Sequence, residues 1–176
     1  MAVRPILSLE SPILRQKAKR IKHIDKSLDP LIQDMIDTMH DAPGIGLAAP
    51  QIGVPLRLMV IEIEGELTTL VNPEIVKSQG AWEPEEGCLS IPGYVANVKR
   101  AWAVTVKAKN RHGRDVRLKG EGLFGQALQH EIDHLDGILY IDRLDDMDKL
   151  RKVEAGRRGR RRTAEPAPER TPEPVI

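Results

Sequence analysis

The amino-acid sequence predicts an α+β fold in which antiparallel β-sheets pack around a helix in the C-terminal part, with an amphipathic helix near the N-terminus. Two stretches, residues 27–40 and 123–135, carry apolar residues at the three- and four-residue spacing of a helix. The sequence between them contains short strand-like runs. Strands that lie between two helices indicate an α+β domain.

The first helix and the strands follow from the apolar pattern. The apolar residues on one side of the first helix are Leu28, Leu31, Ile32, Met35, Ile36 and Met39. The strand-like runs are residues 56–63, 68–71, 74–79, 95–98, 101–108 and 115–119. Aromatic residues make up only 3% of the chain, so we expect a core built mainly from Ile, Leu, Val and Met.

The second helix, residues 123–135, carries the most informative motif, His130-Glu131-Ile132-Asp133-His134. On a helix His130 and His134 lie one turn apart on the same face, so both imidazoles can bind one metal ion, and Glu131 can act on a water beside it. The sequence Asp136-Gly137 supplies the helix stop. The pattern predicts metal-activated hydrolysis. The alternative is a helix with two core or surface histidines and a coincidental glutamate.

Two histidines leave a catalytic metal one protein ligand short. The metzincin spacing requires a third histidine six residues after His134, where this chain has Tyr140. Cys88 is the only cysteine, which excludes an intramolecular disulfide and indicates a reducing compartment. Beside an incomplete metal site we favour a thiolate ligand. The alternatives are an inert buried thiol and a Cys/His nucleophile pair, and the latter would leave Glu131 without a role.

A third segment, residues 44–53, combines closely spaced glycines with one uncharged polar side chain, Gln51. Glycine lets backbone approach a ligand closely. The segment also matches the dinucleotide pattern G-x-G-x-x-A. We reject that match because the segment follows a predicted helix rather than a strand, and because Pro50 and Gly53 interrupt the helix that the pattern requires. A tight turn with a solvated Gln51 remains the alternative.

Taken together, three segments resemble the motifs of the peptide deformylase family, in the family's order and at its separations. The opening residues 3–7 and the stretches 14–18 and 135–137 are similar to bacterial members as well, so the resemblance covers roughly residues 3 to 145. The three motif segments are Gly44-Ile45-Gly46-Leu47-Ala48-Ala49-Pro50-Gln51, Glu86-Gly87-Cys88-Leu89-Ser90 and Gln129-His130-Glu131-Ile132-Asp133-His134.

The resemblance implies a metal-dependent amide hydrolase that removes the formyl group from the N-terminal formylmethionine of newly synthesised proteins and releases formate. Cys88, His130 and His134 would hold one divalent ion, which is Fe²⁺ in the family's most active form, with Ni²⁺ or Co²⁺ as working substitutes and Zn²⁺ often found. Glu131 would be the general base toward the metal-activated water and then the acid that protonates the leaving amine.

The resemblance also assigns the groups around the reacting carbon. The Gln51 amide and the backbone N–H of Leu89 would stabilise the oxyanion, and Gly46 would present backbone to a substrate peptide bound as an added strand. Glu86 and Arg100 would form an ion pair that braces the Cys88 loop. For Ile45, Leu123 and Ala127 the alternative is ordinary core. The residues that would line the methionine pocket are Ile45, Leu89, Leu123, Gln126, Ala127 and His130.

Charge divides the chain into two parts. Residues 1–150 carry 19 basic and 22 acidic residues, whereas residues 151–176 carry 8 and 4. We therefore expect a catalytic domain over residues 1–150 and a tail that is basic at residues 157–162 and then rich in Pro and Glu. A solvated, disordered tail is the simpler interpretation. The alternative is an electrostatic contact with RNA, namely the ribosome, where the family's substrates emerge.

The sequence lacks a charged and apolar signal-peptide pattern in residues 1–10, and no apolar stretch approaches transmembrane length. We expect a cytoplasmic protein without a membrane partner. Two other classes of function are alternatives. A zinc endopeptidase shares the His-Glu-x-x-His pattern but lacks its downstream ligand here. A non-catalytic RNA-binding protein with a structural metal would give Glu131 and Gln51 no role.

Overall fold

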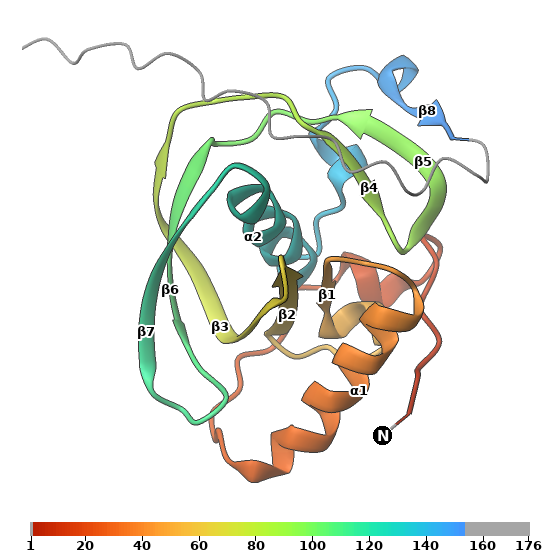
Figure 1. Cartoon of the computed structure of the whole chain (residues 1–176). Coiled ribbons are helices and arrows are strands. Elements are labelled where there is room, and N and C mark those ends of the chain that lie inside the picture. Colours follow the sequence, from red (N-terminus) through yellow and green to blue (C-terminus); the bar gives the residue numbers. More distant parts are fainter. Residues whose placement is uncertain (1, 154–176) are drawn as a thin grey trace, which may run out of the picture.

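The computed structural model, which describes residues 2–153, places helix α2 among strands of two antiparallel sheets (Figure 1). The α+β prediction is confirmed. Short 3₁₀ helices lie at Pro12–Arg15, Lys26–Leu28, Ala49–Ile52, Tyr140–Arg143 and Met147–Lys149. The helices and strands are α1 (Asp29–Asp41), β1 (Gly46–Ala48), β2 (Leu58–Ile63), β3 (Glu66–Gln79), β4 (Glu85–Cys88), β5 (Ile91–Asn97), β6 (Ala103–Lys109), β7 (Asp115–Glu121), α2 (Gly122–Leu135) and β8 (Arg151–Lys152).

The larger sheet has the strand order β1-β2-β3-β6-β7 and separates two parts of the core. Successive residues of β2 point to opposite faces, as the two-residue period of a strand requires. Met59 and Ile61 pack with α2, whereas Leu58 and Val60 pack with α1. Strand β2 is therefore buried on both faces, and it fixes the distance between the two helices. Because β1 ends the sheet, only one of its edges is paired.

The N-terminal helix begins two residues later than the sequence pattern predicts. Lys26–Leu28 forms a 3₁₀ turn, in which the side chain of Asp25 accepts a hydrogen bond from the backbone of Ser27. Pro30 then occupies the first turn of α1, where its missing N–H costs nothing. The predicted apolar side of α1 is buried at Ile32, Met35, Ile36 and Met39.

Two predicted strands, residues 68–71 and 74–79, form the single long strand β3. The interruption between them is a shift of register between Val71 and Glu74. There Asn72 adopts a φ of 53°, and its side-chain amide bonds both the N–H and the C=O of Ile21 at 2.9 Å. The gap between the two predicted strands is therefore an irregularity within one strand and not a turn between two strands.

The smaller sheet, β4-β5-β8, carries the end of the described chain. Arg151 and Lys152 pair with Val95 and Tyr94 of β5, so the sheet extends two residues beyond the boundary expected at residue 150. The arginine run and the Pro/Glu-rich segment of the predicted tail lie in residues 154–176, outside the described part of the chain. Among residues 2–153, no helix is both long and apolar enough to cross a membrane.

Helix α2 is held at its C-terminal end by a buried arginine. Arg57 donates to the carbonyl oxygen of Leu135 at 3.1 Å, to the carboxylate of Asp136 at 2.6 Å and to the carbonyl of Pro73 at 3.0 Å. A cation is favourable at a helix C-terminus, where carbonyl groups have no partner within the helix. The side chain of Arg57 is 6% exposed, so this contact joins α2 to the strands from inside the protein.

Replacing Arg57 by Met should lower the free energy of unfolding by about 2–4 kcal/mol, because the change removes buried charge-assisted hydrogen bonds to Leu135, Asp136 and Pro73. The Leu135 carbonyl keeps its bond from the N–H of Ala18. Urea unfolding followed by tryptophan fluorescence measures this. Arg20→Met is the matched control, since Arg20 forms an exposed ion pair with Glu74, and its cost should stay below about 1 kcal/mol. Equal losses in both variants would contradict the role given to Arg57.

Candidate functional site

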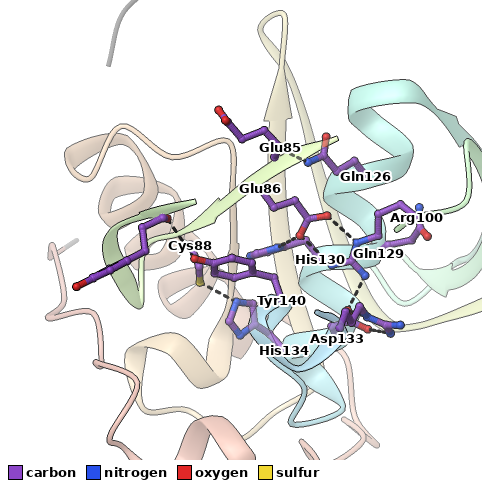
Figure 2. Close-up of polar contacts among 12 residues, drawn as sticks. Glu85, Glu86, Cys88, Arg100, Gln126, Gln129, His130, Asp133, His134 and Tyr140 are labelled. Atoms are coloured by element: carbon purple, nitrogen blue, oxygen red, sulfur yellow. Dashed lines mark hydrogen bonds and ion pairs between the residues drawn. The ribbon is translucent and has the colours of Figure 1, made fainter. Parts of the chain in front are cut away.

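Three potential metal ligands from two separate elements meet inside the protein. Cys88 ends β4, and His130 and His134 lie on α2 (Figure 2). Their ligand atoms all lie within 4.8 Å of one another. The Cys88 Sγ is 3.2 Å from the Nε2 of His134. Among residues 2–153 this is the group with metal-binding geometry, and His23, His40 and His112 are exposed elsewhere.

The chemistry of these groups fits a divalent transition metal. One thiolate and two imidazoles accept Fe²⁺, Co²⁺, Ni²⁺ or Zn²⁺. The Nδ1 of His130 is 2.9 Å from Glu86, which leaves Nε2 available to a metal. Such a carboxylate partner is typical of a metal-bound histidine. Because the group within the described residues has three members, a metal there would keep a position open for water or substrate, as catalytic sites do.

Glu131 lies beside this cluster in a closely packed position. It is 4% exposed, and its Oε2 has no hydrogen-bond partner among residues 2–153. A side chain on Gly46 of β1 would overlap the Oε1 of Glu131 and lie 3.0 Å from its Cδ. Burial raises the pKa of Glu131 to about 7. The site therefore contains a carboxyl group that can both accept and donate a proton near neutral pH.

Gln51 joins the glycine-rich segment to the cysteine loop. It lies in the 3₁₀ helix Ala49–Ile52 and is 2% exposed, so the alternative of a solvated side chain is excluded. Its Oε1 accepts from the backbone N–H of Ala48 at 2.9 Å. Its Nε2 donates to the Oγ of Ser90 at 3.2 Å and lies 3.6 Å from the Cys88 Sγ. The amide nitrogen therefore faces the potential metal ligands.

The expected ion pair between Glu86 and Arg100 is confirmed (Figure 2). Arg100 donates from Nε and Nη2 to the two oxygens of Glu86, at 2.6 and 2.9 Å. Burial would raise the pKa of Glu86, but the hydrogen bonds from Arg100 and His130 lower it to about 2. Glu86 is thus an ionised carboxylate, and it links Arg100 to His130.

The residues predicted to line a substrate pocket fall into two groups. Ile45 and Leu123 are 45% and 49% exposed, so they are not ordinary core. Ala127 is 4% exposed and belongs to the core between α2 and the large sheet. Leu89 is half-buried, and its Cδ1 lies 2.8 Å from where a side chain on Gly44 would begin, so the glycine-rich segment and the cysteine loop touch.

Gln126 is buried, and its side-chain amide donates to the carbonyl of Glu85 at 3.0 Å. Tyr140, at the metzincin ligand position, is 1% exposed, and its ring stacks on His130 with centroids 6.2 Å apart. At the position where a metzincin protease has its third metal ligand, this chain therefore has a residue that packs against His130. Sequence reasoning gave no role to Asp133 or Arg143, which extend the ion pairs of Arg100. For Asp133, its place between the two histidines was the available signal.

Comparison with known proteins agrees with this site. The family model for polypeptide deformylase matches residues 3–150. The peptide deformylase of Dehalococcoides mccartyi strain CBDB1 is 53% identical over 155 residues, which cover 87% of this chain and 93% of that protein. The peptide deformylase of Thermomicrobium roseum is 49% identical over 162 residues, covering 87% of this chain and 92% of that protein.

Solved structures give the same result. The crystal structure of a peptide deformylase from Legionella pneumophila has a TM-score of 0.81 and 54% identity, covering 84% of this chain and 89% of that chain. The peptide deformylase of Synechococcus elongatus in complex with actinonin has a TM-score of 0.80 and 43% identity, covering 82% and 80%. The chain belongs to the peptide deformylase family, whose members are enzymes that remove the N-formyl group from nascent peptides.

Proposed function

We propose that this chain hydrolyses the formyl group of N-terminal formylmethionine with a metal held by Cys88, His130 and His134 and with Glu131 as its general base. The observation that carries the proposal is a Cys-His-His group, buried at Cys88 and His134 and partly buried at His130, whose ligand atoms lie within 4.8 Å of one another. Next to it in sequence is a buried carboxylate that has an oxygen without a protein partner in the described residues. A metal and a base in one enclosed position are what water-dependent amide cleavage requires.

The three ligands would bind one divalent ion, and we propose Fe²⁺, as the family resemblance implies, with Ni²⁺, Co²⁺ or Zn²⁺ as alternatives. Such an ion would supply Lewis acidity, which lowers the pKa of a water molecule and polarises a carbonyl oxygen. Glu86 supports this arrangement because it accepts from the Nδ1 of His130 and so fixes the orientation of that ring.

Glu131 would move the proton. Its unpartnered Oε2 takes a proton from the water that attacks the formyl carbon, and then gives it to the amine nitrogen as the C–N bond breaks. The products are formate and a free N-terminal amine. Proton transfer by a positioned carboxylate typically accelerates a reaction by about 10²–10⁴-fold. The close packing of Glu131 against Gly46 keeps the carboxylate in one position for both transfers.

Gln51 and Leu89 would stabilise the negative charge that develops on the formyl oxygen. Support for Gln51 comes from its Nε2, which lies 3.6 Å from the Cys88 Sγ and is held by hydrogen bonds at both ends of its amide. Its N–H groups are therefore oriented before the reaction begins. Loss of one such preorganised donor typically costs about 3–4 kcal/mol of transition-state stabilisation. Leu89 would contribute its backbone N–H, directly after Cys88.

The unpaired edge of β1 gives the substrate a place to bind. Gly46 lies in this edge strand, so an extended peptide can add to it through backbone hydrogen bonds. On α2, Leu123, Ala127 and His130 follow one another at helical spacing and so share one side of the helix. This side, together with Ile45, Leu89 and Gln126, would form the methionine pocket. The exposure of Ile45 and Leu123 suits side chains that a substrate covers.

We further propose that the protein acts in the cytoplasm as a catalytic domain over residues 1–150 with a tail over residues 151–176. The first two residues of the tail pair with β5, and the remainder would reach ribosomal RNA. The support is the charge of the tail, which carries 8 basic and 4 acidic residues. Because RNA is a polyanion, such a contact weakens as salt rises.

Replacing Glu131 by Gln should lower kcat for formate release from an N-formylmethionyl peptide by about 10²–10⁴-fold, because the amide cannot accept the proton. The assay uses anaerobically prepared ferrous enzyme, with metal content measured in both proteins. Metal content should stay the same, since Glu131 is not a proposed ligand. A variant with unchanged kcat would refute the role of Glu131, and cleavage at an internal peptide bond would indicate a protease.

Replacing Gly46 by Ala should displace the carboxylate of Glu131, because the added methyl overlaps its Oε1. A misplacement of about 1 Å typically costs about 10²-fold in rate, so we expect a loss of that order in kcat. Metal content and the circular dichroism spectrum should match those of the wild type. The combined variant Gly46→Ala/Glu131→Gln should be no slower than Glu131→Gln alone. A further additive loss would mean that Gly46 acts independently of Glu131.

Deletion of residues 154–176 should abolish co-sedimentation with ribosomes at low salt while leaving kcat unchanged, because the basic run at residues 157–162 supplies the contact. Deletion of residues 163–176 alone is the matched control, since it removes Arg170 but keeps the five arginines at residues 157–162 and should keep binding. If the longer deletion sediments like the full chain, the tail makes no such contact.

A further inference from the structure

A row of charged side chains leads from the exposed Arg143 to His130, and Figure 2 shows its inner members Asp133, Arg100 and Glu86. It begins at Arg143, in the 3₁₀ helix Tyr140–Arg143, whose side chain is 40% exposed. The Nε and Nη2 of Arg143 each lie 2.5 Å from one carboxylate oxygen of Asp133. Asp133 is buried on α2 between the two histidines, and its Oδ2 also accepts from the Nη1 of Arg100 at 2.7 Å.

The row continues inward without a break. Arg100 uses its remaining groups, Nε and Nη2, to hold both oxygens of Glu86. The Oε2 of Glu86 is 2.9 Å from the Nδ1 of His130. The side chains of Arg100 and Glu86 are each 2% exposed, so this inner part is shielded from solvent and salt. The position of the side chains at the surface end of the row therefore affects the position of the side chains at the His130 end.

The charges of the row alternate in sign and balance. Arg100 serves two carboxylates, those of Glu86 and Asp133. The bidentate pair with Arg143 neutralises Asp133 from its other side, so Arg100 can keep two of its donors on Glu86. Without Arg143, Asp133 would hold a buried negative charge with Arg100 as its remaining cationic partner, and it would draw the guanidinium away from Glu86.

We propose that Arg143 is a positioning residue for the metal site: through Asp133, Arg100 and Glu86 it fixes the orientation and basicity of the His130 ring. The proposal rests on the proposed metal ligands. It assigns a role in the site to an exposed side chain that touches neither ligand nor substrate. His130 is the ligand that should respond, because the Nδ1 of His134 has no partner among the described residues through which such a row could act.

The test compares Co²⁺ binding in the full-length wild type and in Arg143→Ala. Removal of a group in the outer shell of a metal site typically costs 10–100-fold in affinity or activity. We expect about 10-fold weaker Co²⁺ binding, at the lower end of this range, because three side chains of the row lie between Arg143 and His130. Competition with a chelator measures the affinity.

The visible absorption bands of bound Co²⁺ should also shift, and the loss of activity should fall on kcat rather than KM.

Three further variants make the comparison specific. Arg143→Lys should recover part of the affinity, because it restores the charge but not the bidentate geometry. Arg111→Ala is the matched control: Arg111 is 39% exposed and pairs with Asp29 of α1, which is not a member of the row, and the variant should match the wild type. Glu86→Ala removes the direct partner of His130 and should lose at least as much affinity as Arg143→Ala.

The outcomes separate the two proposals. If Glu86→Ala weakens Co²⁺ binding but Arg143→Ala leaves affinity and absorption bands unchanged, the role of Arg143 is wrong and the metal site stands. A lower melting temperature of Arg143→Ala with unchanged metal binding would likewise overturn it, as a purely structural effect. If wild-type protein binds no Co²⁺, or the bound ion shows no thiolate charge-transfer band, the proposed metal site itself fails and this inference fails with it.

Discussion

The paired contacts of Arg100 with Glu86 and Asp133 are the interaction on which the site depends. Replacing a buried ion pair by apolar residues is often neutral or stabilising, whereas removal of one partner is strongly destabilising. We therefore attribute these contacts to position rather than to net stability. They hold β4, which ends in Cys88, against α2, which carries both histidines. The three potential ligands come together because one guanidinium bridges their supporting strand and helix.

Helix α2 buries polar side chains in addition to the apolar residues that it packs against the sheet. Each buried polar group needs a partner, and residues that lie just before strands β6 and β2 supply several. The amide of Gln129 bonds both the N–H and the C=O of Ala101, and Arg57 bonds the last carbonyl of the helix. Apolar contacts on the sheet side come from residues such as Leu128 and Leu135. The helix is thus fixed in rotation as well as in position.

The sequence predicted those parts whose signal is local. Both helices have a clear apolar period, and the ligand set followed from the motif and the single cysteine. The short strands β1 and β4 were missed, because Gly46-Leu47-Ala48 and Glu85-Glu86-Gly87-Cys88 have little strand propensity and become strands through pairing with β2 and β5. Arg143 gave no signal either. From the sequence alone, an isolated arginine after the second helix is expected to be solvated, and only the fold reveals that Arg143 contacts Asp133.

The two histidines of the site are supported in different ways. His130 has a carboxylate partner within a row of four charged residues, whereas the Nδ1 of His134 has no partner within residues 2–153. The orientation of His134 must therefore come from packing and from the position of the helix end, one residue before the carbonyl that Arg57 holds. The fold and the proposed metal site share this contact: a displacement of the last turn of α2 moves the proposed ligand His134 directly, and within residues 2–153 no hydrogen bond from its Nδ1 resists the movement.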